Sequence, residues 1–366
     1  MPGFTPSRLV LARKRKGITK KELAEKAGIS VRSLTAYEAE LQEPTPLTLA
    51  RLADALGFPV EFFHRPPISA PSLEGASFRA LKRMTASQRD QAVSAGAFAV
   101  ELSEWIDSRF HLPSAESLPR YRGVDAETAA QAVREEWGLG QRSVRNMIHL
   151  LEAHGVRVFS LAEESRDVDA FSTWRHDVPY IFLNTMKSPE HSRMDAAHEL
   201  GHLVLHSADE PLRGRDEERD ANAFGAAFLM PEGSIYSEAP RGGRVDDLVT
   251  AKRKWGVSVA ALAYRLHKLH LLTDWQFRSA FIEISARGYR TNEPSSIPGE
   301  TSQVLDKVFR ALGEEGITRA DVAQELALPL DEIQKLVFGL VMTSVEGGGS
   351  SAGTEWAEPK LRLVDG

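Results

Sequence analysis

Apolar residues recur at helical spacing along most of the chain, and Gly, Pro and capping residues divide them into short segments. The pattern at residues 87–110 predicts a long helix, which could be a dimer contact or could pack against the rest of the molecule. The other helices are expected at residues 7–16, 20–26, 31–40, 47–56, 126–137, 143–154, 217–229 and 246–254, with helix-turn-helix-like pairs at 255–269 and 300–340.

Strand-like alternation is confined to one part of the chain. Residues 156–161, 170–174 and 179–183 are rich in β-formers, and Pro179 suits the start or the edge of a strand. The sequence therefore predicts a mainly helical α+β protein with a small sheet. The strand at 179–183 directly precedes a helix, so it is either an edge that could bind an extended chain or a strand of the sheet's core.

The first helices form a helix-turn-helix pattern. Thr19 and Glu22 make a capping box, the turn contains Gly28, and Ser30 can cap the third helix. Such a pair places its second helix in the major groove of DNA. Buried positions are expected at Leu23, Ala24, Ala27, Ile29, Leu34, Tyr37 and Leu52. Groove contacts are expected from Ser30, Arg32, Ser33 and Thr35, and a phosphate contact from Lys20.

Charge is distributed unevenly along the chain. The net charge is −6, but residues 1–66 hold eleven Lys/Arg against seven Asp/Glu, which leaves −10 for the remainder. Residues 8–32 alone contain nine basic and two acidic side chains. The sequence therefore predicts a polyanion-binding module, with double-stranded DNA as its partner, on an acidic body.

Composition excludes several classes of chemistry. The chain of 366 residues has no cysteine, so disulfides, thiolate metal sites and cysteine nucleophiles are ruled out. No apolar run is long enough to span a bilayer and no secretory leader is evident. A soluble, cytoplasmic protein without a membrane partner is expected.

One helix carries a candidate metal site. Ser188 is a good N-cap and Pro189 a good first residue for a helix that contains His198, Glu199 and His202. Residues four apart project from one face of a helix, so the two imidazoles can reach the same tetrahedral Zn²⁺. Glu199 would lie beside a zinc-bound water. The alternative is a buried helix whose histidines are only packed or hydrogen-bonded.

A catalytic zinc site needs a third protein ligand and one open position. The helix expected at 217–229 has an acidic beginning that could face the metal, with Glu217, Glu218 and Asp220 as candidates. These acids could instead only complement the helix dipole. A purely structural zinc site is disfavoured, because such sites usually have four protein ligands and often use cysteine.

These motifs resemble known families. The run His-Glu-Leu-Gly-His-Leu-Val-Leu-His at 198–206, followed by Glu-Arg-Asp-Ala-Asn-Ala-Phe-Gly-Ala-Ala-Phe-Leu-Met-Pro at 218–231, resembles the ImmA/IrrE family of zinc metallopeptidases. Residues 18–38 resemble the Xre/Cro family of DNA-binding domains. The resemblance implies a bacterial regulatory protease, often encoded on mobile elements or in stress-response loci, whose typical substrate is a specific helix-turn-helix repressor.

The resemblance also indicates which of the three acidic residues is the third zinc ligand. Glu218 aligns with the family's third zinc ligand, and helical geometry turns Glu217 about 100° and Asp220 about 200° away from it. Asn222 lies one turn beyond Glu218, where it could hydrogen-bond a ligand histidine. Glu199 would take a proton from the attacking water and pass it to the leaving amine. Tyr180, His206 and Tyr236 are unranked candidates for stabilising the oxyanion.

The expected function is transcription control by a DNA-binding zinc endopeptidase. The alternative is a regulator whose peptidase-like domain senses a metal, ligand or partner without proteolysis. The expected division is a DNA-binding domain at 1–66, a linker with the long helix at 67–125, the peptidase domain at 126–285, a helical domain at 286–342 and a flexible tail at 343–366.

Overall fold

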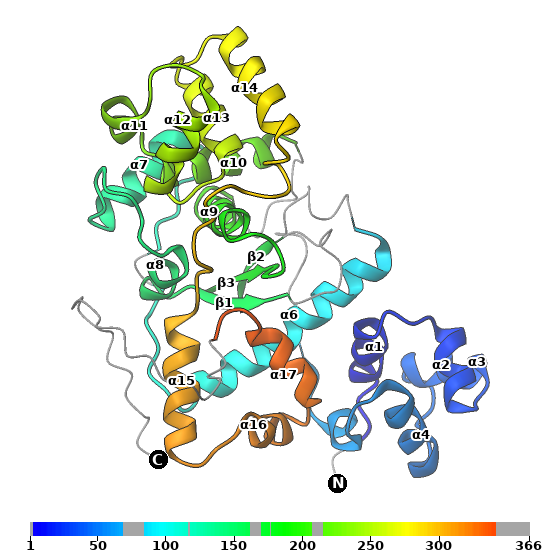
Figure 1. The fold of residues 1–366 in the computed structure, drawn as a ribbon. Coiled ribbons are helices and arrows are strands. Elements are labelled where there is room, and N and C mark those ends of the chain that lie inside the picture. The colour runs from blue at the N-terminus through cyan, green and yellow to red at the C-terminus, as the bar shows by residue number, and fades with distance from the viewer. Residues whose placement is uncertain are drawn as a thin grey trace.

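A computed structural model describes residues 3–68, 84–115, 118–161, 170–175, 177–206 and 215–341. The predicted tail at 343–366 lies outside these residues, as does most of the proline-rich segment after residue 68. In agreement with the predicted α+β class, most described residues are helical and three short strands form one sheet (Figure 1). None of the described helices is both long and apolar enough to cross a membrane.

The N-terminal helices form a compact head. They are α1 (Pro6–Arg15), α2 (Lys20–Ala27), α3 (Val31–Glu38) and α4 (Pro46–Leu56), followed by the 3₁₀ turn η1 (Val60–His64). The capping box of Thr19 and Glu22 and the N-cap at Ser30 are both confirmed. The predicted core positions are buried, except that Ile29 is only half-buried against the same core.

The body contains the sheet and the remaining helices. Its first three described helices are α6 (Ala86–Asp107), α7 (Ala126–Glu136) and α8 (Met147–Ala153). The three strands of the sheet follow, β1 (Arg157–Ser160), β2 (Phe171–Arg175) and β3 (Val178–Leu183). The central helices are α9 (Pro189–Leu205) and α10 (Arg215–Leu229). They are followed by α11 (Glu232–Glu238), α12 (Val245–Ala251), η3 (Lys252–Lys254), α13 (Val259–Lys268), α14 (Asp274–Ala286), α15 (Gln303–Glu314), α16 (Arg319–Leu326) and α17 (Leu330–Val337).

The sheet has the order β1-β3-β2, with β1 parallel and β2 antiparallel to β3. The strand that directly precedes α9 is therefore the central strand, and its interpretation as an edge is wrong. Ser172 pairs with Ile181, so both residues face α9, whereas Arg157 and Arg175 face α6 and form ion pairs with Asp107 and Glu104. The sheet thus lies between α9 and α6 (Figure 1).

The head packs directly on the body. Helix α1 lies against α6, and the C-terminal helix α17 reaches both the head and the sheet (Figure 1). Arg15 Nε donates to Glu332 Oε2 at 2.6 Å, and both side chains are at most 4% exposed. Arg8 binds Glu101 of α6 at 2.7 Å. Helix α6 therefore packs against the rest of the molecule, which is one of the two alternatives expected for the long helix.

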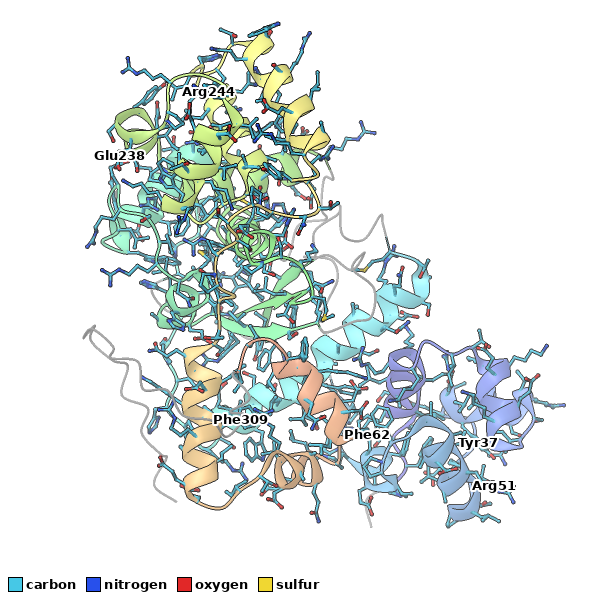
Figure 2. The ribbon with its side chains drawn as sticks, viewed as in Figure 1. Tyr37, Arg51, Phe62, Glu238, Arg244 and Phe309 are labelled. Atoms are coloured by element: carbon cyan, nitrogen blue, oxygen red, sulfur yellow. The ribbon has the colours of Figure 1, made fainter. Side chains whose placement is uncertain are left out.

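This packing corrects the interpretation of the basic N-terminal region. Arg8, Lys14, Arg15 and Lys16 all form ion pairs with acids of α6 or α17. Part of the local positive charge therefore attaches the head to the acidic body and is not available to DNA. Charge counting along the sequence missed this because it does not distinguish the two faces of α1. Figure 2 shows the head, with Tyr37, Arg51 and Phe62 labelled, beside the body.

Candidate metal centre and helix-turn-helix face

Helix α9 carries both candidate histidine ligands. Ser188 caps its first turn by accepting a hydrogen bond from the backbone of His191, and Pro189 occupies the first turn. The helix continues without a break to Leu205, so His198 and His202 project from one face. Their Nε2 atoms lie 3.0 Å apart and the ring centroids 4.7 Å apart. The two imidazoles are therefore close enough to share one metal ion.

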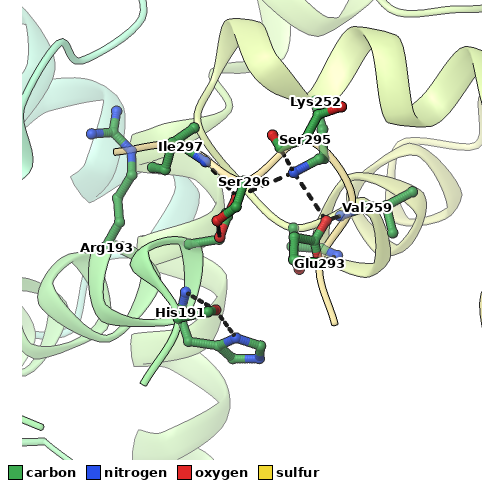
Figure 3. A network of polar contacts seen from close by, with 12 residues as sticks. His191, Arg193, Lys252, Val259, Glu293, Ser295, Ser296 and Ile297 are labelled. Carbon is green, nitrogen blue, oxygen red and sulfur yellow. Dashed lines mark hydrogen bonds and ion pairs between the residues drawn. The ribbon is translucent and has the colours of Figure 1, made fainter. Parts of the chain in front are cut away.

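The beginning of α9 is held by a buried polar network. Lys252 Nζ is fully buried and lies 3.2 Å from Glu190 Oε1 and 3.1 Å from Glu293 Oε1 (Figure 3). Glu190 also accepts hydrogen bonds from Ser296 Oγ and from the backbone of Ile297, each at 2.9 Å. Because these contacts join α9 to η3 and to residues 293–297, the network fixes the position of the helix before the histidines.

Helix α10 packs closely against α9 through two glycines. A Cβ atom at Gly225 would lie 3.0 Å from the backbone nitrogen of His198, and one at Gly201 would lie 3.1 Å from Cβ of Phe224. These positions therefore allow the helix backbones to approach more closely than larger residues would permit. Glu218 lies two turns before Gly225 on the same face of α10 and thus faces α9.

Glu218 completes a group of three potential metal ligands. Its Oε1 lies 3.4 Å from His202 Nε2, and its Oε2 lies 3.6 Å from His198 Nε2. One ligand atom from each residue falls within 4.8 Å of the other two. Among the described residues, this group contains neither Glu217 nor Asp220. Two imidazole nitrogens and a carboxylate form a donor set that suits zinc, and three protein ligands leave a position for a reactant.

The group has a strong electrostatic effect on His202, which is 4% exposed. Burial alone would lower the pKa of His202, but the neighbouring carboxylates of Glu218 and Glu199 outweigh burial and raise the pKa above its ordinary value. The negative charge of the pocket therefore favours a cation at the position where the three ligands meet.

Glu199 is buried beside the ligands and is held by the sheet. It is 1% exposed, and Ser172 Oγ of β2 donates to its Oε2 at 2.7 Å. Burial raises the pKa of Glu199 to about 7, against the opposing effects of His202 and the Ser172 hydrogen bond. Ser172 could not be predicted from the sequence, because nothing in the strand pattern distinguishes a serine that faces α9 from one that only fills the sheet.

The three candidates for stabilising an oxyanion lie in different places. Tyr180 is buried on the α6 side of the sheet, where burial raises its pKa. Tyr236 donates its hydroxyl to the carbonyl of Leu269 at 3.3 Å. His206 lies beside the ligands, with its Nδ1 3.0 Å from His202 Nδ1, and burial lowers its pKa to about 4. Of the three, only His206 contacts a candidate metal ligand, His202.

Asn222 supports the ligand-bearing turn of α10. Its Nδ2 donates to the backbone oxygen of Glu218 at 2.6 Å. This bond differs from the predicted one to a ligand histidine, because Asn222 lies one turn after Glu218 and its side chain folds back along the helix. It fixes the backbone of Glu218, the candidate carboxylate ligand.

The helix-turn-helix face lies on the head's α2 and α3. Gly28 adopts a left-handed conformation with φ of 63° between these helices. Arg32 and Thr35 are exposed on α3, and the Ser30 and Ser33 hydroxyls lie 2.9 Å apart at its start. Lys20 Nζ lies 3.0 Å from Glu38 Oε2. The predicted contact residues thus share one end of the head, although Lys20 already has an acidic partner.

Comparison with known families agrees with this architecture. Residues 9–63 match the helix-turn-helix family, and residues 151–267 match a peptidase family described as the IrrE N-terminal-like domain. The chain therefore combines an Xre-type helix-turn-helix domain with an IrrE-like metallopeptidase-type domain, as the sequence motifs predicted. No curated protein matches the chain.

Proposed function

We propose that this protein is a DNA-binding zinc endopeptidase in which His198, His202 and Glu218 hold the metal and Glu199 is the general base. The convergence of these three donor atoms beside a buried glutamate carries the proposal. Zinc bound here would supply Lewis acidity to a water molecule and to the scissile carbonyl.

Glu199, held by Ser172, would carry out the proton transfers of the reaction. Ser172 holds Oε2 of Glu199, which leaves Oε1 to accept a proton from the attacking water and to pass it to the leaving amine. An extended substrate could pair with β2, because within the described residues β2 is hydrogen-bonded to β3 alone. Addition of a substrate strand at this position would bring a peptide bond close to Glu199.

Two substitutions test the metal centre. His202→Ala removes a ligand and should lose bound zinc, measured by metal analysis of the purified protein. Glu199→Gln should keep zinc and lose peptide cleavage, because the amide cannot accept the proton. Cleavage by Glu199→Gln at the wild-type rate would contradict the proposed role of Glu199.

We infer that the substrate is a repressor-type regulator, on the basis of the helix-turn-helix domain and the peptidase-type domain in one chain. Comparing the proteomes of cells that carry the wild type or Glu199→Gln should reveal a repressor fragment in the wild type alone. If no fragment of any regulator depends on Glu199, the proposed substrate class is wrong.

The head would bind double-stranded DNA through α3. Arg32→Ala should weaken binding to the specific promoter site by roughly 1–3 kcal/mol if Arg32 reads a guanine. Titrations against specific and random DNA at matched salt concentration measure the difference. An equal loss on both DNAs would reassign Arg32 to a phosphate contact, and increasing salt should weaken binding to either DNA.

The second candidate is a regulator in which the metal domain acts as a sensor. The buried pair of Arg15 and Glu332 favours this candidate, because it joins the DNA-binding head directly to the body. A Glu199→Gln strain that keeps the complete cellular phenotype would support the sensor, whereas loss of the phenotype would support the peptidase.

A further inference from the structure

We propose that His206 is a positioning residue that selects the metal-binding tautomer of His202. This inference rests on the proposed metal centre and assigns to His206 a role other than stabilising an oxyanion. The two nitrogens of the His202 ring have different neighbours. Nε2 faces His198 and Glu218, whereas Nδ1 faces His206.

In its neutral form, the imidazole ring of His202 carries one N–H proton, either on Nδ1 or on Nε2. A metal ion binds through a lone pair, so binding at Nε2 requires that the proton be on Nδ1. The Nδ1 atoms of His202 and His206 are 3.0 Å apart, a distance at which one must donate and the other must accept. His202 as the donor is the arrangement that leaves its Nε2 lone pair available for the metal.

The position of His206 is fixed by the end of α9. His206 is the C-cap residue with φ of −112° and ψ of 153°, and its backbone nitrogen donates to the carbonyl of His202 at 3.1 Å. The same residue therefore contacts His202 twice, once through the backbone and once through the ring. The ring centroids are 5.0 Å apart and the planes are inclined by 49°, so the two rings are tilted relative to one another and are not stacked.

A neutral imidazole is an unusual acceptor for this purpose, since ligand histidines more often donate to a carboxylate, a backbone carbonyl or water. Because His206 adds no negative charge in its neutral form, it can orient His202 without increasing the negative charge that Glu218 and Glu199 already contribute. Removing such a partner typically weakens metal affinity about 10- to 100-fold.

The first experiment measures zinc affinity of the full-length chain by competition with a chelating dye. His206→Ala should bind zinc about 10- to 100-fold more weakly than the wild type. His206→Asn should recover most of the affinity, because its Oδ1 can accept a hydrogen bond near the position of Nδ1. His191→Ala is the matched control on the same helix, since His191 is exposed and contacts Ser188 at the opposite end.

The second experiment needs no variant. Two-bond ¹H–¹⁵N spectra of the zinc-loaded wild type, with ¹⁵N-labelled histidine, should show a proton on Nδ1 of His202 and none on Nδ1 of His206. A proton on Nδ1 of His206 would overturn the inference even if zinc binds normally. Equal zinc affinity of folded His206→Ala and wild type, or equally weak binding by the Asn and Ala variants, would also overturn it. Failure of the wild type to bind zinc would instead remove the proposed metal centre.

Discussion

Glu152 is a buried carboxylate that joins α8 to the start of α15. It is 4% exposed and accepts hydrogen bonds from the backbone of Gln303 at 2.9 Å and of Val304 at 3.1 Å, and from Ser302 Oγ. Burial raises the pKa of Glu152 to about 7, although these hydrogen bonds oppose the shift. The molecule therefore contains an acid whose charge changes near neutral pH.

This pKa predicts a pH dependence of stability with a defined sign. Below about pH 4.5 the carboxyl is protonated in both the folded and the unfolded chain. As pH rises towards 7, the unfolded chain ionises first, so the wild type loses stability relative to Glu152→Gln, which cannot ionise. The relative loss should be on the order of 3 kcal/mol above pH 7.

Urea unfolding of the wild type and of Glu152→Gln at several pH values measures this difference. Hydrogen bonds lost in the variant change its free energy of unfolding by an amount that does not depend on pH. The test is therefore how the difference in unfolding free energy between the two proteins changes with pH. A difference that stays constant from about pH 4.5 to 8 would mean that the three donors, and not burial, determine the ionisation of Glu152.

Single residues were predictable where a role depends on spacing along one helix. His198 and His202 could be paired in advance, because helical geometry determines which side chains share a face. Glu218, on another helix, was selected by the resemblance to the ImmA/IrrE family. Ser172 and His206 could not be assigned in this way. Their contacts depend on how a strand meets α9 and on how the chain leaves that helix, and neither feature is encoded in a local pattern.

At the scale of elements, the contact between α9 and α10 determines whether the ligands meet. Gly225→Ala would place a methyl group 3.0 Å from the backbone of His198, so the helices must move apart. We expect a loss of about 1–3 kcal/mol in the free energy of unfolding, together with weaker zinc binding, because Glu218 moves with α10.

Gly313→Ala is the matched control for this substitution. It also lies in a helix, and nothing surrounds its Cβ position within 4 Å. Alanine there should leave zinc affinity unchanged and should stabilise the helix by up to about 1 kcal/mol. Unchanged zinc affinity in Gly225→Ala as well would show that the metal centre tolerates a displacement of α10.

The elements themselves were largely predictable, but their arrangement was not. The cap at Ser188 and the capping box at Thr19 follow from local chemistry, and both were found at the predicted residues. The sequence left the edge and the central position of β3 as alternatives, because strand order depends on contacts between distant segments. Alternation identifies a strand but does not show how many neighbours it has.

At the scale of the whole molecule, the pair of Arg15 and Glu332 should contribute strongly to the attachment of the head. Glu332→Ala leaves Arg15 buried without this partner and should cost about 3–5 kcal/mol of unfolding free energy. Asp331→Ala on the same helix is the control. Its pair with Lys335 is about half exposed and should contribute less than about 1 kcal/mol.

Urea unfolding of the three proteins provides the comparison. Replacing both Arg15 and Glu332 by leucine should recover much of the loss, because no buried charge remains without its partner. If Glu332→Ala and Asp331→Ala cost the same, the buried pair contributes no more than a surface pair and the head is held by apolar packing.

The docked head also has a consequence for proteins bound to the same DNA. Since α1 attaches to α6 and α17, the proposed recognition helix α3 has a fixed orientation relative to α9, which carries the candidate histidine ligands. DNA turns once in about 10–10.5 base pairs, so a bound chain would hold its metal centre over one side of the duplex. A neighbouring protein would then be within reach at some rotational phases and not at others. Inserting half a helical turn between the two binding sites would carry that neighbour to the opposite side, whereas inserting a full turn would return it to the side that the metal centre faces.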